Sequence, residues 1–183
     1  MKRGRNKTLL LLLILLNTYC MMFMYSRAAY LGAAVGLFLL FSFKKQWLLV
    51  PLLLAALSWQ VALPEKAVQR FQETTDEYGE MEASAEGRLL IWEKGMELFQ
   101  ENALVGIGYG VFAKLGYDLG DTHNIYVKIL VEQGILGIII FAILILIFIL
   151  EGFRLYRNGD DDLSKGLGLG FAICIIVLLV NNI

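Results

Sequence analysis

Long uncharged apolar runs dominate the pattern of hydrophobic and polar positions along the chain. Five such runs are separated by polar segments: Thr8–Tyr25, Ala28–Phe43, Gln46–Leu63, Gly134–Leu150 and Gly166–Val180. A helix needs roughly 17–25 apolar residues to cross a bilayer core about 30 Å thick, and three of the runs reach this length alone. Lipid offers no partner for backbone amides, so each run is expected to be helical. The pattern predicts an all-α polytopic membrane protein with about five transmembrane helices.

The first run could instead be a cleaved secretory signal peptide. Basic residues precede it within Met1–Lys7, and small residues follow it within Ser26–Ala29. Its length exceeds the usual apolar stretch of about 7–15 residues, and Arg27 lies at the candidate cleavage site. We therefore expect this run to remain as a membrane helix.

Composition supports the membrane class and narrows the partners. Hydrophobic residues make up 58% of the 183 residues and charged residues only 18%, against about 45–50% and about 25% in a typical soluble domain. The net charge of −1 argues against a nucleic-acid partner. Cys20 and Cys174 lie in different apolar runs with no second ligand nearby in sequence, so we expect neither a disulfide nor a metal site there.

Basic residues in short loops mark the cytoplasmic side of a membrane protein. Nine lysines and arginines lie before the first run, between the second and third runs, and between the fourth and fifth runs. All nine fall on one side if the helices alternate in direction. The N-terminus is therefore expected to be cytoplasmic, which leaves the turn at Arg27 and the stretch Pro64–Thr122 outside.

The long outer stretch divides the chain into three parts. We expect three transmembrane helices in residues 1–63, an extracytoplasmic loop in residues 64–124 and two transmembrane helices in residues 125–183. The loop holds twelve of the seventeen acidic residues and only five basic ones. Its first third, Glu65–Glu86, is acidic with little periodicity and is expected to be a mobile or surface segment.

An amphipathic helix is predicted from Arg88 onward. Apolar residues recur there at spacings of three and four: Leu89, Trp92, Met96 and Phe99. Asn102 is the expected stop, followed by a turn-rich stretch over residues 105–110. A further helix over residues 125–133 is expected to continue into the fourth apolar run.

Two arginines on the outer side are candidates for binding an anionic group. Arg27 lies between two apolar runs, and Arg88 opens the amphipathic helix one turn before Trp92. Guanidinium presents a planar fork of donors that matches a pair of phosphate oxygens. The structural alternatives are that Arg27 extends to lipid headgroups and that Arg88 stacks on Trp92 or balances the acidic loop.

His123 is the single histidine and lies where the outer loop meets the fourth membrane helix. Imidazole titrates near neutral pH, so it can take a proton from an acceptor hydroxyl or, when charged, stabilise a departing phosphate. The alternative is a hydrogen-bonded structural histidine. Asp121 alone is too little for a metal site, so we expect no metal and no cofactor.

Two further features have simpler interpretations. Glu132 is expected to lie buried at the membrane edge and to pair with Lys128, one turn earlier, although it could contribute to a polar site. The glycines of residues 106–110 lack the strand before them and the spacing of a nucleotide-binding loop, so we reject that function.

Five short stretches, considered together, are more specific than any one of them. They are Ser26–Leu31, Gly87–Met96, Glu101–Gly110, Thr122–Tyr126 and Glu132–Gly137. In this order and context the chain resembles the O-antigen ligase and polymerase family of polytopic membrane proteins. The resemblance covers roughly residues 22–150.

The resemblance implies a fold and an activity. Family members are helical type C glycosyltransferases that act, without a metal, on undecaprenyl-pyrophosphate-linked glycans at the outer face of the bacterial cytoplasmic membrane. By this resemblance Arg27 and Arg88 hold the pyrophosphate and His123 is catalytic. The substrate-binding set is Arg27, Arg88, Trp92, Asn124 and Glu132. The expected partners are a lipid-linked oligosaccharide donor and a glycan or lipid acceptor.

The chain departs from the family in having fewer predicted spans. We therefore expect it to be incomplete, a fragment whose missing helices or second subunit would complete the enzyme. Two other functions stay open: a transporter that binds a lipid-linked glycan without breaking bonds, and a non-catalytic fragment or partner of such an enzyme. Inverted repeats and helices broken at the membrane midplane would favour transport, and the sequence shows neither.

Overall fold

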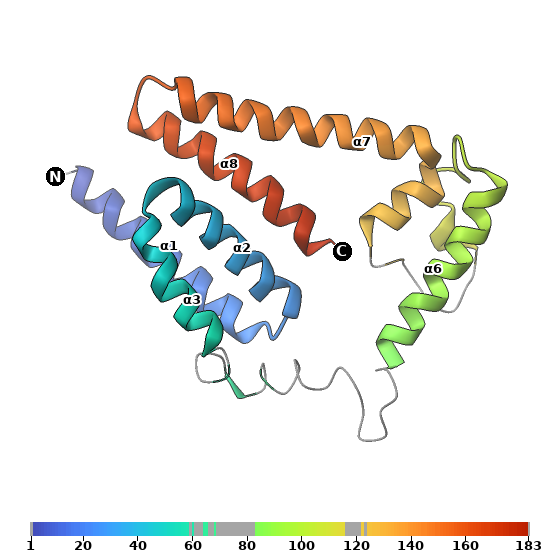
Figure 1. The fold of residues 1–183 in the computed structure, drawn as a ribbon, viewed down its shortest axis with the longest axis horizontal. Helices are drawn as coiled ribbons and strands as arrows, with labels where there is room; N and C mark the ends of the chain where they lie inside the picture. The colour runs from blue at the N-terminus through green and yellow to red at the C-terminus, as the bar shows by residue number, and fades with distance from the viewer. Residues whose placement is uncertain are drawn as a thin grey trace. The chain divides into compact units, whose positions relative to one another are not determined.

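The computed structural model describes residues 2–58, 60, 64, 65, 68, 83–115, 122 and 124–182. Its regular elements within these ranges are helical (Figure 1). Three of the described helices are long and apolar enough to cross a membrane: α2 (Arg27–Lys44), α7 (Ile125–Asn158) and α8 (Asp162–Asn181). The predicted all-α polytopic membrane fold is confirmed. The chain divides into two compact units, Met1–Thr74 and Thr75–Ile183, each described by itself below.

The first unit contains α1 (Lys2–Phe23), α2 and α3 (Leu49–Leu57), with a 3₁₀ turn at Gln46–Leu48. The first apolar run lies in α1, which begins before the run at Lys2 and ends at Phe23, two residues before the predicted end. The described part of the third run is helical over Gln46–Leu57. The predicted end of the third run, Leu63, lies outside the described residues, as does most of the predicted surface segment Glu65–Glu86.

The first described helix of the second unit is α6 (Ala83–Glu101), the predicted amphipathic helix, which ends one residue before the predicted stop at Asn102. α6 packs on the first part of α7 through a small core of Ile91, Phe112 and Val131. Phe112 comes from a 3₁₀ turn, Phe112–Lys114. Gly95 permits this packing, because a Cβ there would lie only 3.1 Å from the Val131 side chain.

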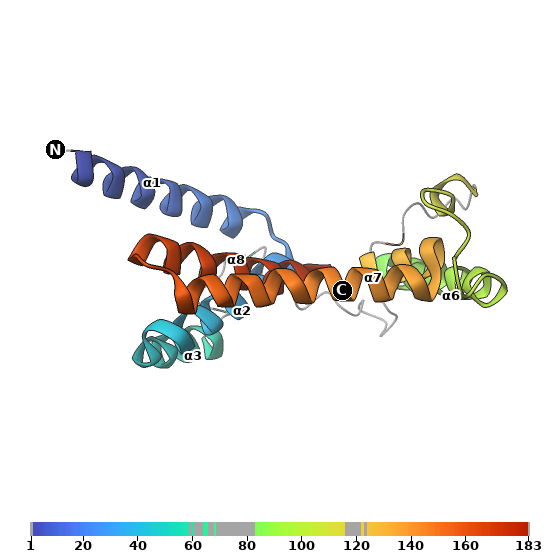
Figure 2. The same cartoon turned by 90° about the horizontal axis from the view of Figure 1, so that it is seen from above.

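The α7–α8 hairpin is the largest contact of the second unit, and the two helices lie side by side in both views (Figures 1 and 2). Their backbones approach closely at Gly152 and Gly168. A Cβ on Gly168 would lie 2.5 Å from the Tyr156 amide nitrogen, and one on Gly152 would lie 2.9 Å from Ala172 Cβ. Small residues allow membrane helices to pack this closely. Such helices associate through dispersion forces, because the hydrophobic effect does not drive their association in lipid.

α7 is not one straight helix, so the predicted continuation from residues 125–133 into the fourth span is wrong. Gly134 has φ 66° and ψ −164°, outside the helical region, and the chain turns sharply there (Figure 1). The rings of Tyr126 and Phe141 have centroids 6.4 Å apart, whereas a continuous helix would separate these residues by about 22 Å along its axis. The first part of α7 therefore folds back beside the second part.

A glycine-containing loop, residues 102–110 and hereafter the glycine loop, supplies the backbone hydrogen bonds that this break removes. The amides of Ile107 and Gly108 donate to the carbonyls of Val131 and Glu132, at 3.0 and 2.9 Å. The carbonyls of Ala103 and Leu104 accept from Ile135 and Leu136, at 2.8 and 3.2 Å. A broken helix leaves such groups without partners, and each one left unpaired in a buried setting costs about 1–3 kcal/mol.

Two glycines permit the close approach of the glycine loop to α7. A Cβ on Gly106 (φ 69°) would lie 2.3 Å from the Glu132 carbonyl carbon. A Cβ on Gly134 would lie 2.5 Å from the Leu104 carbonyl carbon. The turn-rich stretch that the sequence predicts at residues 105–110 is therefore the partner of the α7 break.

Candidate functional site

The segment on either side of His123 is held between α6 and α7. Thr122 and Asn124 are both buried, at 1% and 8% exposure. The Trp92 indole Nε1 donates to the Thr122 carbonyl at 2.9 Å, which ties the segment to α6. His123 itself lies outside the described residues. Its two neighbours in the chain are thus fixed by α6 on one side and by the start of α7 on the other.

Asn124 begins α7 as its N-cap. Its side-chain Oδ1 accepts from the amides of Tyr126 and Val127, at 2.9 and 3.2 Å. The Thr122 hydroxyl donates to the Asn124 carbonyl at 3.0 Å, which links the two described neighbours of His123 to each other. An N-cap of this kind stabilises a helix by typically about 1 kcal/mol. Asn124, predicted as a substrate contact, is therefore also a structural residue.

Tyr126 joins this segment to the membrane hairpin, a role that the sequence analysis missed. Its hydroxyl donates to the Leu179 carbonyl at 2.8 Å, near the end of α8. Its ring meets Phe141 of α7 edge to face, with 74° between the ring planes. The aromatic residue at the end of the Thr122–Tyr126 motif was the available signal, but its partners lie far along the chain.

Arg88 lies one helical turn before Trp92 on α6, and residues four apart share a helix face. Because Trp92 donates to Thr122, this is the face of α6 toward the segment that carries His123. Arg88 is exposed. The second unit therefore brings Arg88, Trp92, Thr122 and Asn124 to one region.

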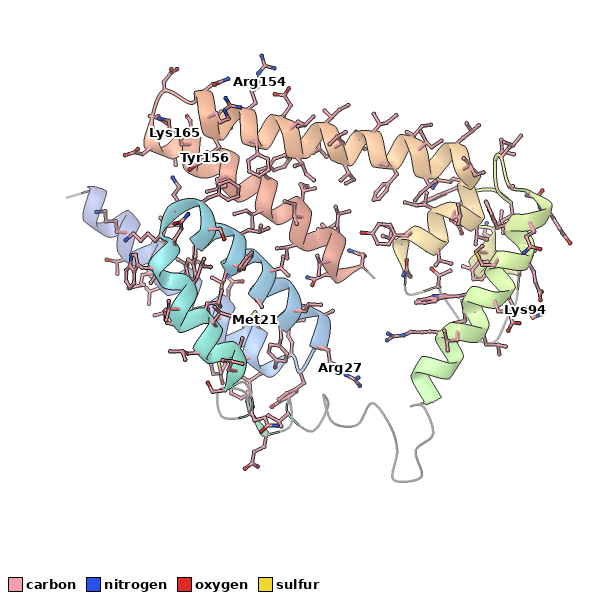
Figure 3. All side chains as sticks on the ribbon, in the orientation of Figure 1. Met21, Arg27, Lys94, Arg154, Tyr156 and Lys165 are labelled. Atoms are coloured by element: carbon pink, nitrogen blue, oxygen red, sulfur yellow. The ribbon has the colours of Figure 1, made fainter. Side chains whose placement is uncertain are left out.

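Arg27 belongs to the first unit, where it is the first residue of α2. The preceding Ser26 caps the helix, with its Oγ accepting from the Ala29 amide at 3.4 Å. The Tyr30 hydroxyl donates to the Met22 carbonyl at 2.7 Å and ties α2 to the end of α1. Arg27 is half-buried and its side chain extends outward from the end of α2 (Figure 3).

Glu132 is buried at the α7 break, at 1% exposure, as the sequence predicts. Within the part of the chain that the structure describes, neither of its carboxylate oxygens has a hydrogen-bond partner. The predicted pair with Lys128 is therefore wrong. Glu132 lies two residues before the break at Gly134, and its backbone carbonyl accepts from the Gly108 amide of the glycine loop. A buried carboxyl without a partner carries a desolvation cost that packing alone does not offset.

Two comparisons with known proteins find nothing: no curated protein and no solved structure matches the chain. A third, with protein-family models, matches residues 10–142 to the family described as O-Antigen ligase. The match begins within α1 and ends within the second part of α7, and so includes all five resembling stretches. Helices able to span a membrane agree with that match. The chain belongs to the O-antigen ligase family.

Proposed function

We propose that the chain transfers or polymerises an undecaprenyl-pyrophosphate-linked glycan at the outer face of a bacterial cytoplasmic membrane. The family itself indicates a glycosyltransferase-like ligase that works in surface polysaccharide assembly. The finer proposal rests on one observation above all: the Trp92–Thr122 hydrogen bond, which ties the α6 face carrying Arg88 to the segment carrying His123.

The proposed reaction is a displacement at the anomeric carbon of the donor sugar. The acceptor hydroxyl attacks this carbon, His123 takes the hydroxyl proton, and the bond from the anomeric carbon to the pyrophosphate oxygen breaks. The electron pair leaves with undecaprenyl pyrophosphate, and the new glycosidic linkage is inverted. Arg27 and Arg88 neutralise the charge that develops on the leaving group.

The remaining predicted substrate contacts have supporting roles in this proposal. The Trp92 indole N–H is used by Thr122, which leaves its ring face for a sugar or for Arg88. Asn124 Oδ1 is used by the helix cap, so its amide group is the part available to a substrate. Glu132 would reach a substrate only from the buried α7 break, where its carboxylate lacks a partner within the described residues.

The topology of the proposal follows the basic residues. Arg154 and Lys165 lie at the turn between α7 and α8 (Figure 3), and basic short loops favour the cytoplasm. We propose membrane helices in residues 1–63, an outer loop in residues 64–124 and membrane helices in residues 125–183. The outer loop then carries Arg88 and His123, and no metal takes part.

Transport is the alternative that a broken helix would favour. The break in α7 comes before a second part that runs to Asn158. That part is about 36 Å long at 1.5 Å per residue, enough to cross a bilayer core about 30 Å thick by itself. The break therefore lies at the end of a span rather than at its midplane, which supports glycan transfer over transport.

The test is glycan transfer by the chain in lipid nanodiscs, from a synthetic polyprenyl-pyrophosphate donor. We expect Arg27→Ala, Arg88→Ala and His123→Ala each to lower the rate at least about 100-fold. Arg88→Lys should restore little, because ammonium lacks the planar fork. Lys94→Ala is the matched control, a cation on the same helix that pairs with Glu97 at 2.9 Å. The Lys94→Ala rate should equal that of the wild type.

Two results would contradict the proposal. Unchanged transfer by the His123→Ala and Arg88→Ala variants, at equal membrane abundance, would remove these residues from the site. Donor that binds and crosses a vesicle membrane without transfer would establish transport. Transfer that persists in EDTA is expected, and its loss in EDTA with recovery on adding Mg²⁺ would overturn the metal-independent reaction.

A further inference from the structure

The connection between α1 and α2, directly before Arg27, has a strained backbone. α1 ends at Phe23 and α2 begins at Arg27, so residues 24–26 make the whole connection. Tyr25 within it has φ 49°, the one positive φ of a non-glycine residue in the described part of the chain. A residue with a bulky side chain rarely adopts this conformation, and it persists only where surrounding contacts impose it. Contacts elsewhere in the first unit must therefore hold this turn.

Tyr30 supplies contacts on both sides of Arg27. Its backbone amide donates to the Ser26 carbonyl at 3.2 Å, and its side-chain hydroxyl donates to the Met22 carbonyl at 2.7 Å. Met22 lies in the last turn of α1, where carbonyls have no partner within the helix. Tyr30 thus joins the end of α1 to the residue directly before Arg27.

Aromatic rings support the turn from the α1 side. The Tyr25 ring meets Phe23 edge to face, with centroids 6.3 Å apart and 81° between the planes. The Phe23 ring in turn packs against Tyr19, with centroids 4.7 Å apart. Both contacts involve residues that precede Arg27, so they do not set the direction in which α2 leaves the turn. The Tyr30 hydroxyl bond does, because it spans from α2 back to α1.

We propose that Tyr30 is a positioning residue for Arg27, and that its hydroxyl bond to Met22 orients the Arg27 guanidinium toward the donor pyrophosphate. The inference rests on the proposed function, which assigns the pyrophosphate to Arg27. Tyr30 lies three residues after Arg27, and residues three apart are neighbours on a helix surface. A guanidinium binds two phosphate oxygens through a fixed planar fork, so a rotation of the first turn of α2 weakens the contact.

The test measures the Kd of a fluorescent polyprenyl pyrophosphate for the full chain in lipid nanodiscs. Tyr30→Phe removes the hydroxyl and keeps the ring. Tyr19→Phe, on a tyrosine of α1 that is 62% exposed, is the matched control. Arg27→Ala, alone and combined with Tyr30→Phe, completes a double-mutant cycle. Membrane abundance and thermal unfolding of every variant are measured in parallel.

We expect Tyr30→Phe to raise the Kd about three- to tenfold, the effect of one lost hydrogen bond, and Tyr19→Phe to leave it near wild type. The double variant should match Arg27→Ala alone, because Tyr30 acts through Arg27. A merely structural role of Tyr30 would make the two single effects multiply in the double variant. That result, or an unchanged Kd in Tyr30→Phe, would overturn the positioning role.

A rescue variant tests the strained turn itself, also where Tyr30→Phe folds poorly. Glycine adopts a positive φ without steric cost. Adding Tyr25→Gly to Tyr30→Phe should therefore restore both the thermal midpoint and the Kd toward wild type. Met24→Gly in the same background is the control, since it adds backbone freedom one residue away from the strain, and it should restore neither. Equal behaviour of the two glycine variants would contradict the proposal.

The Arg27→Ala arm separates a failure of this inference from a failure of the proposed function. A Kd that rises in Arg27→Ala but not in Tyr30→Phe rejects the positioning role and leaves the proposed function standing. A Kd unchanged by Arg27→Ala removes Arg27 from the pyrophosphate site, and both are rejected. The expected Kd values without glycan transfer by the wild type would reject the transfer reaction and keep the positioning role.

Discussion

Trp92 is the residue on which the local geometry of the site depends most directly. Its indole N–H reaches the Thr122 carbonyl across a sequence separation of 30 residues. A hydrogen bond of this kind contributes about 0.5–1.5 kcal/mol to stability when both partners are otherwise buried. Its removal also frees the segment that carries His123, so it should affect activity more than stability.

Trp92→Phe keeps an aromatic ring on α6 and removes only the donor. We expect the free energy of unfolding to fall by about 1 kcal/mol and glycan transfer to fall several-fold, because the Thr122–Asn124 turn loses its tie to α6. Thermal unfolding and transfer rates check this. Trp47→Phe, an exposed tryptophan of the first unit, is the control. Equal effects of the two substitutions would show that the Trp92 bond does not position the site.

Asp161 gives the α7–α8 turn a defined pH dependence. Its carboxylate caps α8 by accepting from the Ser164 amide at 2.6 Å. That bond, helped by the Ser164 hydroxyl, lowers the pKa of Asp161 from its ordinary value of 3.8. A lowered pKa means that the cap stabilises the folded state above pH 3.8 and that this contribution is lost as the pH falls through the lower folded-state pKa.

Asp161→Asn should remove this pH dependence, because an amide caps without titrating. We expect the wild-type thermal midpoint to fall relative to the variant as the pH drops below 3.8. Asp160→Asn, the neighbouring exposed acid, should follow the wild-type curve. Parallel curves for wild type and Asp161→Asn would contradict the assigned cap. Detergent-solubilised protein and a pH series suffice for the measurement.

At the scale of elements, the contact between the glycine loop and the α7 break can be tested with two glycines of the same conformation. Gly106 and Gly110 have φ values of 69° and 70°. An alanine at either position pays the same backbone cost of about 1–2 kcal/mol. A Cβ at Gly106 would meet the Glu132 backbone at 2.3 Å, while one at Gly110 would meet nothing within 4 Å.

Gly106→Ala should therefore cost more stability than Gly110→Ala, by about 2–3 kcal/mol. It should also abolish transfer, because the loop can no longer satisfy the backbone groups at the break. Unfolding of each variant, with transfer measured at equal abundance, separates the two effects. If the two variants behave alike, the loop is not docked on α7 in the membrane.

The α7–α8 hairpin offers a similar matched pair. A Cβ on Gly168 would lie 2.5 Å from the Tyr156 amide nitrogen, whereas one on Gly170 would have open space. Both glycines are helical, so Gly170→Ala should be neutral or slightly stabilising. Gly168→Ala should separate the helices and lower the thermal midpoint by several degrees. A neutral Gly168→Ala would place the close packing in doubt.

The positions of the helices could be predicted from the sequence, but the path of α7 could not. An uncharged run in lipid has only one way to satisfy its backbone, so its helical state follows from composition. The reversal at Gly134 depends on partners near residue 104, some 30 residues away, and no local periodicity reports them. Apolar residues lie on both sides of Gly134, so the hydrophobic pattern predicts one continuous helix across it.

For the candidate site, too, some features could be predicted from the sequence and others could not. Arg27, Arg88 and His123 could be singled out by residue type and by resemblance, and the Trp92–Arg88 spacing by helix geometry. The partner of Tyr126 is the Leu179 carbonyl, 53 residues later. Such a bond links two helices that pack through glycines, and nothing in the hydrophobic pattern specifies that register.

At the scale of the whole molecule, the proposed orientation can be checked on intact cells. Cys20→Ser and Cys174→Ser provide a background without native thiols. Tyr109 on the glycine loop is 85% exposed, and Asp160 lies in the α7–α8 turn. An impermeant maleimide should label Tyr109→Cys from outside, and Asp160→Cys only after permeabilisation. The opposite pattern would invert the topology and place Arg88 in the cytoplasm.

The break at Gly134 also bears on how the protein is made. During synthesis the glycine loop emerges before α7, so the partners for the interrupted backbone already exist when residues 131–136 leave the ribosome. The loop and the first part of α7 can then pair at the membrane surface while the rest of the span partitions into lipid. The order of translation thus matches the order in which the bare backbone groups need partners. A circular permutant with α7 and α8 ahead of the loop would expose the unpaired backbone groups of α7 before their partners in the loop are made.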